Sequence, residues 1–251
     1  MFSEINNDAL ACMIKANPEY EAILQTIIDD NKKTTSMFVH ELRNPLSLLK
    51  GTIQYIEQKH PEAKDFKYWD QLQDLLDDME HIMADASLLN ICNYIHKDNT
   101  NLLQLIQNVI NSFMPQALTE LIDLSITIDS TSEPYFYSYP CDSVKMKQVF
   151  SNLIKNAFEA TEPGDFIHIN LKYIPGECPP SPAKLSIQIS NNGQAIPEEA
   201  IKDIFVPFVT YKKGGTGVGL ALVKKVLDLH YGSICVDSNE DLTSFTLLLP
   251  L

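Results

Sequence analysis

The chain has 251 residues, enough for two modest domains, and its hydrophobic content of 45% supports packed cores. Its 19 Lys and Arg against 33 Asp and Glu give a formal net charge of −14, which argues against a nucleic-acid partner. Five scattered cysteines without a C-x-x-C pair favour reduced thiols over disulfides or zinc. No run of eighteen apolar residues and no signal-peptide pattern occur, so we expect a cytoplasmic protein without membrane insertion.

Residues from about 34 to 59 are predicted to form a helix with a coiled-coil seam. His40 lies one position past a seam residue and is expected to face outward, with Asn44 one turn later on the same face. The seam residues are separated by alternating steps of three and four: Val39, Leu42, Leu46, Leu49, Ile53 and Ile56.

A second apolar seam follows a turn at about 59–64. Two seamed helices joined by a short turn form an antiparallel hairpin, and a single hairpin leaves part of its seam exposed. We therefore expect a homodimer through residues of about 34–96, in which two hairpins form a four-helix bundle. The alternative is an intramolecular bundle that uses the helical residues 1–33. The second seam comprises Tyr68, Leu72, Leu75, Met79, Ile82, Ala86 and Leu89.

After the polar stretch 96–101 the pattern changes to mixed helices and strands, so we predict an α+β fold in three regions. These are a helical extension (1–33), a helical hairpin (34–97) and an α/β sandwich domain (98–251). Asp142 is a predicted helix N-cap. Helices are predicted at about 101–114, 142–160, 198–204 and 217–230, and strands at 124–128, 134–139, 166–173, 184–190, 233–237 and 244–249.

Two sequence strings in the second half suggest a site for phosphates. Asn152 and Asn156 lie one turn apart on a helical face, and two amide oxygens suit a Mg²⁺ ion that also holds phosphate. The glycine-rich string 214–220 opens a helix, where backbone N–H groups can approach phosphates. Lys212 and Lys213 precede this string and could neutralise phosphate charge. Surface asparagines and ordinary surface lysines are the alternatives.

The string V-H-E-L-R-N-P-L at 39–46 resembles the H-box of sensor histidine kinases. Four further strings, in the family's order, resemble its N-box (148–160), G1 box (189–197), F-box (204–208) and G2 box (214–220). The resemblance covers about 34–251. It implies a dimeric hairpin that carries a phosphoacceptor histidine, followed by an ATP-binding domain of the Bergerat type shared with gyrase and chaperone ATPases.

The resemblance implies an ATP-dependent histidine kinase that phosphorylates itself on His40. Glu41 would accept the ring proton, and Arg43 would offset charge on the transferred phosphoryl group. The phosphoryl group would pass to an Asp of a response-regulator receiver domain, and Asn44 would orient water for the reverse phosphatase reaction. A separate sensor or regulatory protein is a possible further partner.

ATP and Mg²⁺ are the ligands that the resemblance implies for the second domain. The metal would be held by Asn152 and Asn156. The nucleotide would be bound by Asn152, Lys155, Asn156, Asn191, Gly193, Lys212, Lys213, Gly215, Thr216, Gly217, Gly219 and Leu220.

The G1 string departs from the family pattern D-x-G-x-G at two positions. Asn191 replaces the Asp that accepts the adenine amino group, and Ala195 replaces the second Gly. We expect weaker nucleotide binding, because a neutral amide accepts a weaker hydrogen bond than a carboxylate. These departures leave open a phosphorelay phosphotransferase or scaffold whose second domain does not bind ATP. A gyrase-type ATPase is a third reading, opposed by Asn152 standing where those enzymes carry a Glu.

Overall fold

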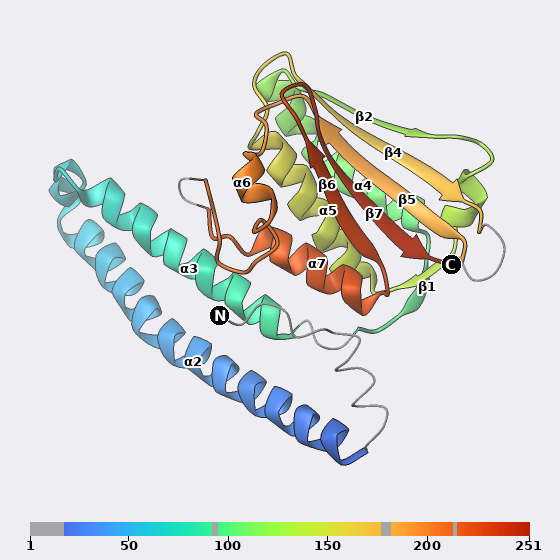
Figure 1. Cartoon of the computed structure of the whole chain (residues 1–251). Helices are drawn as coiled ribbons and strands as arrows, with labels where there is room; N and C mark the ends of the chain where they lie inside the picture. Colours follow the sequence, from blue (N-terminus) through green and yellow to red (C-terminus); the bar gives the residue numbers. More distant parts are fainter. Residues whose placement is uncertain (1–17, 92–94, 177–181, 213–214) are drawn as a thin grey trace. The chain divides into compact units, whose positions relative to one another are not determined.

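The computed structural model describes residues 18–91, 95–176, 182–212 and 215–251 (Figure 1). The chain divides into two compact units, Met1–Asn90 and Ile91–Leu251. In the described ranges, no helix combines the length and the apolar character needed to cross a membrane.

The first unit is a helical hairpin made of α2 (Pro18–Lys59), the short 3₁₀ helix η1 (Pro61–Asp65) and α3 (Trp69–Ile91). Helix α2 begins at Pro18, well before the start predicted near residue 34, and it continues through Pro45. The part of the predicted extension that the structure describes is thus continuous with the first hairpin helix, and residues 1–17 lie outside the described residues.

The interior of the hairpin is built from apolar residues seven positions apart on each helix, so only one stripe of each helix faces the other. The apolar seam predicted for the second helix does not form the interior of the hairpin, so that prediction was wrong here. Leu76, only 6% exposed, packs inside, whereas its neighbour Leu75 is 53% exposed. The interior residues are Val39, Leu46 and Ile53 of α2 and Trp69, Leu76 and Met83 of α3.

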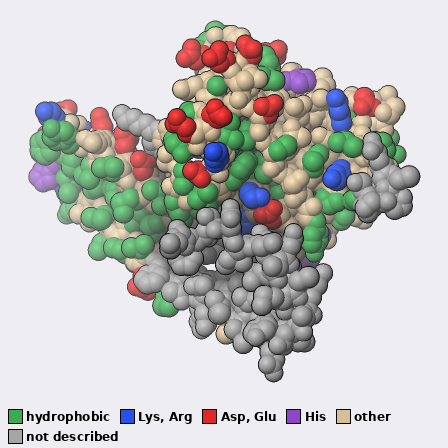
Figure 2. All heavy atoms as spheres, viewed as in Figure 1, with side chains coloured by type: hydrophobic (Ala, Val, Ile, Leu, Met, Phe, Trp, Pro, Cys, Tyr) green, Lys and Arg blue, Asp and Glu red, His purple; other side chains and the backbone are tan. Residues whose placement is uncertain are grey.

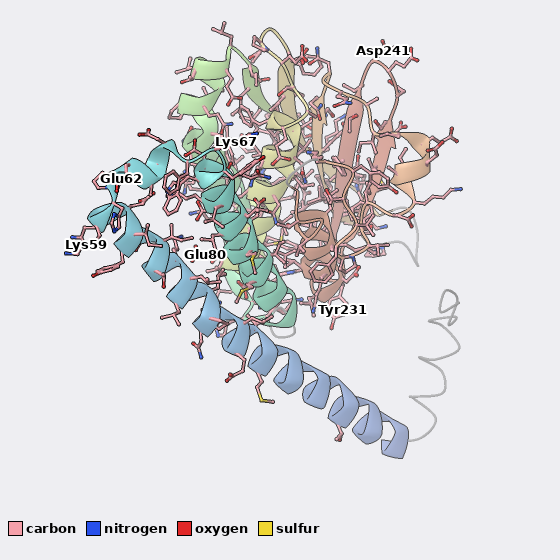
Figure 3. The ribbon with its side chains drawn as sticks, turned by 90° about the vertical axis from the view of Figure 1, so that its left-hand side faces the viewer. Lys59, Glu62, Lys67, Glu80, Tyr231 and Asp241 are labelled. Carbon is pink, nitrogen blue, oxygen red and sulfur yellow. The ribbon has the colours of Figure 1, made fainter. Side chains whose placement is uncertain are left out.

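Polar contacts fix the register of the hairpin beside this core. Lys50 on α2 lies 3.1 Å from Asp77 and 2.7 Å from Glu80 of α3, the latter labelled in Figure 3. Nearer the turn, the indole Nε1 of Trp69 donates to Glu57 at 2.8 Å. Each contact joins one helix to the other, so together they oppose sliding of α3 along α2.

The second unit is a five-stranded mixed sheet with helices packed on one face (Figure 1), which confirms the predicted α+β class. The strand order is β2-β4-β5-β7-β6; β2 pairs parallel with β4 and the other pairs are antiparallel. The strands are β2 (Asp123–Ile128), β4 (Phe166–Ile174), β5 (Lys184–Asn191), β6 (Ser233–Ser238) and β7 (Thr243–Pro250). The helices are α4 (Leu102–Glu120), α5 (Ser143–Phe158), α6 (Glu198–Ile201) and α7 (Gly219–Leu229).

The segment predicted as a strand at 134–139 instead forms a 3₁₀ helix, η2 (Glu133–Phe136), and then the short strand β3 (Tyr139–Cys141). Pro134 favours a helical start and cannot donate to a strand ladder. β3 pairs antiparallel with β1 (Asp98–Thr100), which lies within the polar stretch that the sequence marked only as a boundary.

Candidate functional site

Helix α5 carries two asparagines one turn apart, and it places the first of them, Asn152, beside the start of α7. Its apolar face is buried against its neighbours, and Asp142 caps its N-terminus by accepting from the backbone N of Lys145 at 3.1 Å, as predicted. On the remaining face, Asn152 is half-buried and its Nδ2 donates to the carbonyl oxygen of Gly219 at 3.4 Å. The N-box helix therefore lies directly against the first residue of the helix that follows the G2 box.

The second asparagine lies close to a lysine from the segment ahead of the G2 box. Lys212 Nζ is 3.4 Å from Oδ1 of Asn156 and 2.7 Å from Oε2 of Glu159. Lys155, whose side chain is 70% exposed, points to the same carboxylate at 3.9 Å. Glu159 was not singled out from the sequence, yet it joins both lysines; Lys213 lies outside the described residues.

The G1 loop is held against the turn that follows α5. The N–H of Gln194 donates to the carbonyl oxygen of Ala160 at 2.7 Å. A Cβ on Gly193 would lie 2.1 Å from that same oxygen, so only glycine fits this approach. Ala195, in contrast, does not have a positive φ, so the absence of the second glycine does not strain the backbone of the loop.

Asn191 ends strand β5 on the face that packs against the helices. The side chain is 3% exposed and continues the row Leu185, Ile187 and Ile189, each at most 1% exposed. Its Nδ2 is buried without a hydrogen-bond partner among the described residues. A buried amide without a partner is costly, which marks this position as one where a ligand could supply the missing bond.

The F-box and G2 segments lie against each other. Gly217 has φ +68° and its carbonyl oxygen accepts from the N–H of Phe208 at 3.0 Å; a Cβ on Gly217 would lie 2.5 Å from the oxygen of Val209. A Cβ on Gly215 would similarly lie 2.6 Å from Oγ1 of Thr210. Thr216 and Leu220 are half-buried at the entry to α7, and residues 213–214 lie outside the described residues.

The second unit thus gathers groups that fit a nucleoside triphosphate. An unpaired buried amide lies at the end of β5, a glycine loop fits tightly beside it, and Lys212 and the N-terminus of α7 offer positive charge. Among the described residues there is no cluster of His, Cys, Asp or Glu that could hold a metal.

The H-box residues lie on α2 in the first unit. Glu41, Arg43 and Asn44 are exposed, and Val39 on the inner side of the helix is 6% exposed. The side chain of His40 is outside what the structure describes, so the expectation that it faces outward stays a prediction.

His230 was not predicted to lie near the site. It joins the C-terminal end of α7 to the residue that caps the N-terminus of α5. It is 2% exposed; its Nδ1 is 2.7 Å from the carbonyl oxygen of Val226, and its Nε2 accepts from the N–H of Asp142 at 3.0 Å. Nδ1 therefore carries the proton and donates it. Burial lowers the pKa of this imidazole below its ordinary value.

Comparison with known proteins places this geometry in a family. Residues 141–251 match the family described as "Histidine kinase-, DNA gyrase B-, and HSP90-like ATPase". The catalytic domain of histidine kinase ThkA is 31% identical, with a TM-score of 0.54 over 62% of this chain and 95% of that one. The chain belongs to the two-component histidine kinases, as a catalytic core of that family.

Relatives of the whole chain extend the likeness to the hairpin. A crystal structure of ThkA in complex with the response regulator protein TrrA is 25% identical over 99% of this chain and 68% of that one, with a TM-score of 0.60. Sporulation kinase E of Bacillus subtilis is 28% identical over 84% of this histidine kinase core and 27% of its own length. Sensory histidine kinase/phosphatase NtrB of Azospirillum brasilense is 29% identical over 86% and 54%, respectively. The chain thus spans about a quarter to a half of the length of these curated relatives.

Proposed function

We propose that this chain is an ATP-dependent protein histidine kinase that phosphorylates its own His40 and passes the phosphoryl group to a response regulator. One observation carries the proposal: the G1 and G2 segments, far apart in sequence from the N-box, both contact α5 or the turn that follows it. The meeting points are the bond from Asn152 to Gly219, the contact of Lys212 with Asn156, and the bond from Gln194 to Ala160.

The proposal assigns nucleotide binding to residues 98–251. Asn191 would contact the base, with Gly193 keeping the G1 loop close to α5. Oxygen atoms of Asn152 and Asn156 would hold Mg²⁺, which supplies charge neutralisation at the phosphates when bound. The remaining phosphate contacts would come from Lys155, Lys212, Lys213, Gly215, Thr216, Gly217, Gly219 and Leu220.

The hairpin, residues 34–97, would supply the nucleophile. One imidazole nitrogen of His40 attacks the γ-phosphorus; the new N–P bond forms as the P–O bond to the departing ADP breaks. Glu41 takes the proton from the other ring nitrogen, and the guanidinium of Arg43 offsets negative charge on the transferred group. Asn152 cannot take a proton from water, which favours storage of ATP for His40 over its hydrolysis.

The apolar side chains left uncovered on the hairpin support a homodimer through residues of about 34–96. Figure 2 shows hydrophobic side chains gathered on its surface. A Leu or Ile that becomes well buried contributes about 1.5–3 kcal/mol before entropy is subtracted, so a second hairpin would offset the exposure. The exposed residues, each at least 41% exposed, are Leu42, Leu49, Tyr68, Leu72, Leu75, Met79 and Ile82.

The partner for phosphotransfer would be a receiver domain with an Asp acceptor. ThkA was crystallised with the response regulator TrrA, which supports a partner of this class. Asn44 is exposed one helical turn after His40, where its amide could orient water for dephosphorylation. The name of NtrB, a histidine kinase/phosphatase, supports this second activity.

Incubation of the chain with ATP labelled on the γ-phosphate tests the proposal. We expect acid-labile, alkali-stable label on the wild type and none on His40→Gln. His60→Gln is the matched control, because His60 is an exposed histidine of the same hairpin. Undiminished label on His40→Gln, or no label on a folded wild type, would refute the kinase. Calorimetry with Mg-ATP separates the phosphorelay alternative, which predicts no binding at millimolar nucleotide.

A further inference from the structure

Asn191 and Asn192 are neighbours in the G1 string with opposite hydrogen-bonding states. Both polar atoms of the Asn192 side chain have a partner: its Nδ2 donates to Asp165 at 3.0 Å, and its Oδ1 accepts from the N–H of Phe166 at 2.7 Å. Asn191 is more deeply buried, yet its Nδ2 has no partner among the described residues. The side chain of Asn192 therefore stabilises the loop, whereas the Nδ2 of Asn191 is an unsatisfied hydrogen-bond donor.

The residues around Asn191 do not offer its amide a partner. In the sheet, Asn191 lies opposite Ile167 on one side and Thr243 on the other. Oγ1 of Thr243 is 2.7 Å from Oγ of Ser238, which in turn accepts from the N–H of Ile196 at 2.9 Å. The hydroxyl of Thr243 thus lies against Ser238, and Nδ2 of Asn191 has no partner among the described residues, so a ligand is a natural source of one.

A side-chain amide can read two kinds of purine edge. It presents one donor and one acceptor side by side, and rotation by 180° exchanges them. Adenine offers a donor at N6 beside an acceptor at N1. A 6-oxopurine offers an acceptor at O6 beside a donor at N1. An amide can pair with either edge, whereas an ionised carboxylate only accepts and would repel O6.

We propose that Asn191 makes the base site of this chain tolerant of 6-oxopurine nucleoside triphosphates as well as ATP. The inference rests on the proposed function, because it requires the base to lie at Asn191. The structural ground is the unpaired Nδ2 at the buried end of β5, which a 6-oxo group satisfies as well as adenine N1 does. In this chain residue 191 would then set base specificity, and replacement by Asp would restore discrimination.

Calorimetric titration of the full chain with Mg-ATP and Mg-ITP tests this inference directly. ITP differs from ATP at the edge in question and lacks the 2-amino group of GTP, so it probes that edge alone. We expect the wild-type dissociation constants for the two nucleotides to differ by about threefold or less. In Asn191→Asp we expect ITP binding to weaken by at least about tenfold relative to ATP, since the 6-oxo group then faces an acceptor. Asn108→Asp is the control for added charge, because Asn108 is exposed on α4 and its Oδ1 accepts from Gln104, as a carboxylate would.

The outcomes separate this inference from the proposed function. A wild type that binds ATP at least about tenfold more tightly than ITP overturns the tolerance and leaves the kinase standing. A wild type that is folded by its melting curve but binds neither nucleotide overturns the proposed function, and the inference fails with it. The wild-type ratio decides the matter even if a buried Asp at position 191 prevents folding.

Discussion

Nζ of Lys212 lies 2.7 Å from Oε2 of Glu159, so the lysine proposed to bind phosphate is already paired with a carboxylate. Both side chains remain partly exposed, at 47% and 39%, respectively. A pair with that exposure is worth little in stability and is readily exchanged for another anion. The nucleotide phosphates would therefore compete with Glu159 for Lys212.

Replacing Glu159 by Gln should increase the affinity for Mg-ATP. Loss of an exposed ion pair of about 0.2–1 kcal/mol corresponds to at most a fivefold gain, and the gain should shrink at high salt. Calorimetry at two salt concentrations measures both effects. Glu240→Gln removes a carboxylate of an exposed residue in the β6–β7 turn and should leave the affinity unchanged. Weaker binding by Glu159→Gln would mean that this carboxylate positions Lys212 rather than competing for it.

Replacing Asn152 by Ala should weaken ATP binding in the presence of Mg²⁺ far more than in its absence. The Nδ2 of Asn152 donates to the carbonyl oxygen of Gly219, so its Oδ1 is the side-chain atom available to a metal. We expect a loss of at least about tenfold with Mg²⁺ and a small loss with EDTA, as is typical when a group that supports a metal site is removed.

Ser151→Ala is the matched control for Asn152, because Ser151 is the half-buried neighbour on the same helix. Equal losses with and without Mg²⁺ in Asn152→Ala would show that only its bond to Gly219 matters for binding. In that case the metal assignment would be wrong.

Leu75 and Leu76 are adjacent on α3, but substitutions at the two positions should have different effects. Leu76 is 6% exposed inside the hairpin, so Leu76→Ala should lower the free energy of unfolding by about 2–5 kcal/mol. Leu75 is 53% exposed, so Leu75→Glu should leave the hairpin intact and shift the proposed dimer to monomer. Circular dichroism and sedimentation equilibrium separate the two outcomes. A monomeric wild type, or a Leu75→Glu variant that stays dimeric, would contradict the proposed interface.

The strands of the five-stranded sheet were predictable because their two faces differ. In β5 the residues Leu185, Ile187 and Ile189 are buried and alternate with polar ones, and the observed strand differs from the predicted range by one residue. The interior of the hairpin was harder to predict, because α3 carries two neighbouring stripes of apolar residues. Periodicity cannot tell which stripe faces α2, and only the position of Leu76 and Met83 in the structure decides it.

The candidate site was predictable only where it carries a motif. Asn152, Asn156 and Gly193 belong to recognisable strings, and the structure brings their segments together. Glu159 follows Asn156 by three residues, but a surface Glu on a helix gives no signal until Lys212 is found beside it. The unpaired state of Asn191 likewise depends on the neighbouring hydroxyls, which a sequence does not place.

The buried His230 should make the ATP-binding unit less stable in mild acid. The pKa of its imidazole is lowered from the ordinary 6.5 in the folded state, first by burial, so the folded chain favours the neutral ring. Its contribution is complete above about pH 6.5 and is lost as the pH falls toward the lowered value, because the unfolded chain then binds a proton that the folded chain refuses. The loss is at most about 1.4 kcal/mol per pH unit.

We expect the melting temperature of the wild type to fall between pH 7.5 and 5.5. The His230→Gln variant should melt at a lower temperature than the wild type at pH 7.5, but its melting temperature should depend less on pH. An equally steep profile in His230→Gln would assign the acid sensitivity to other groups.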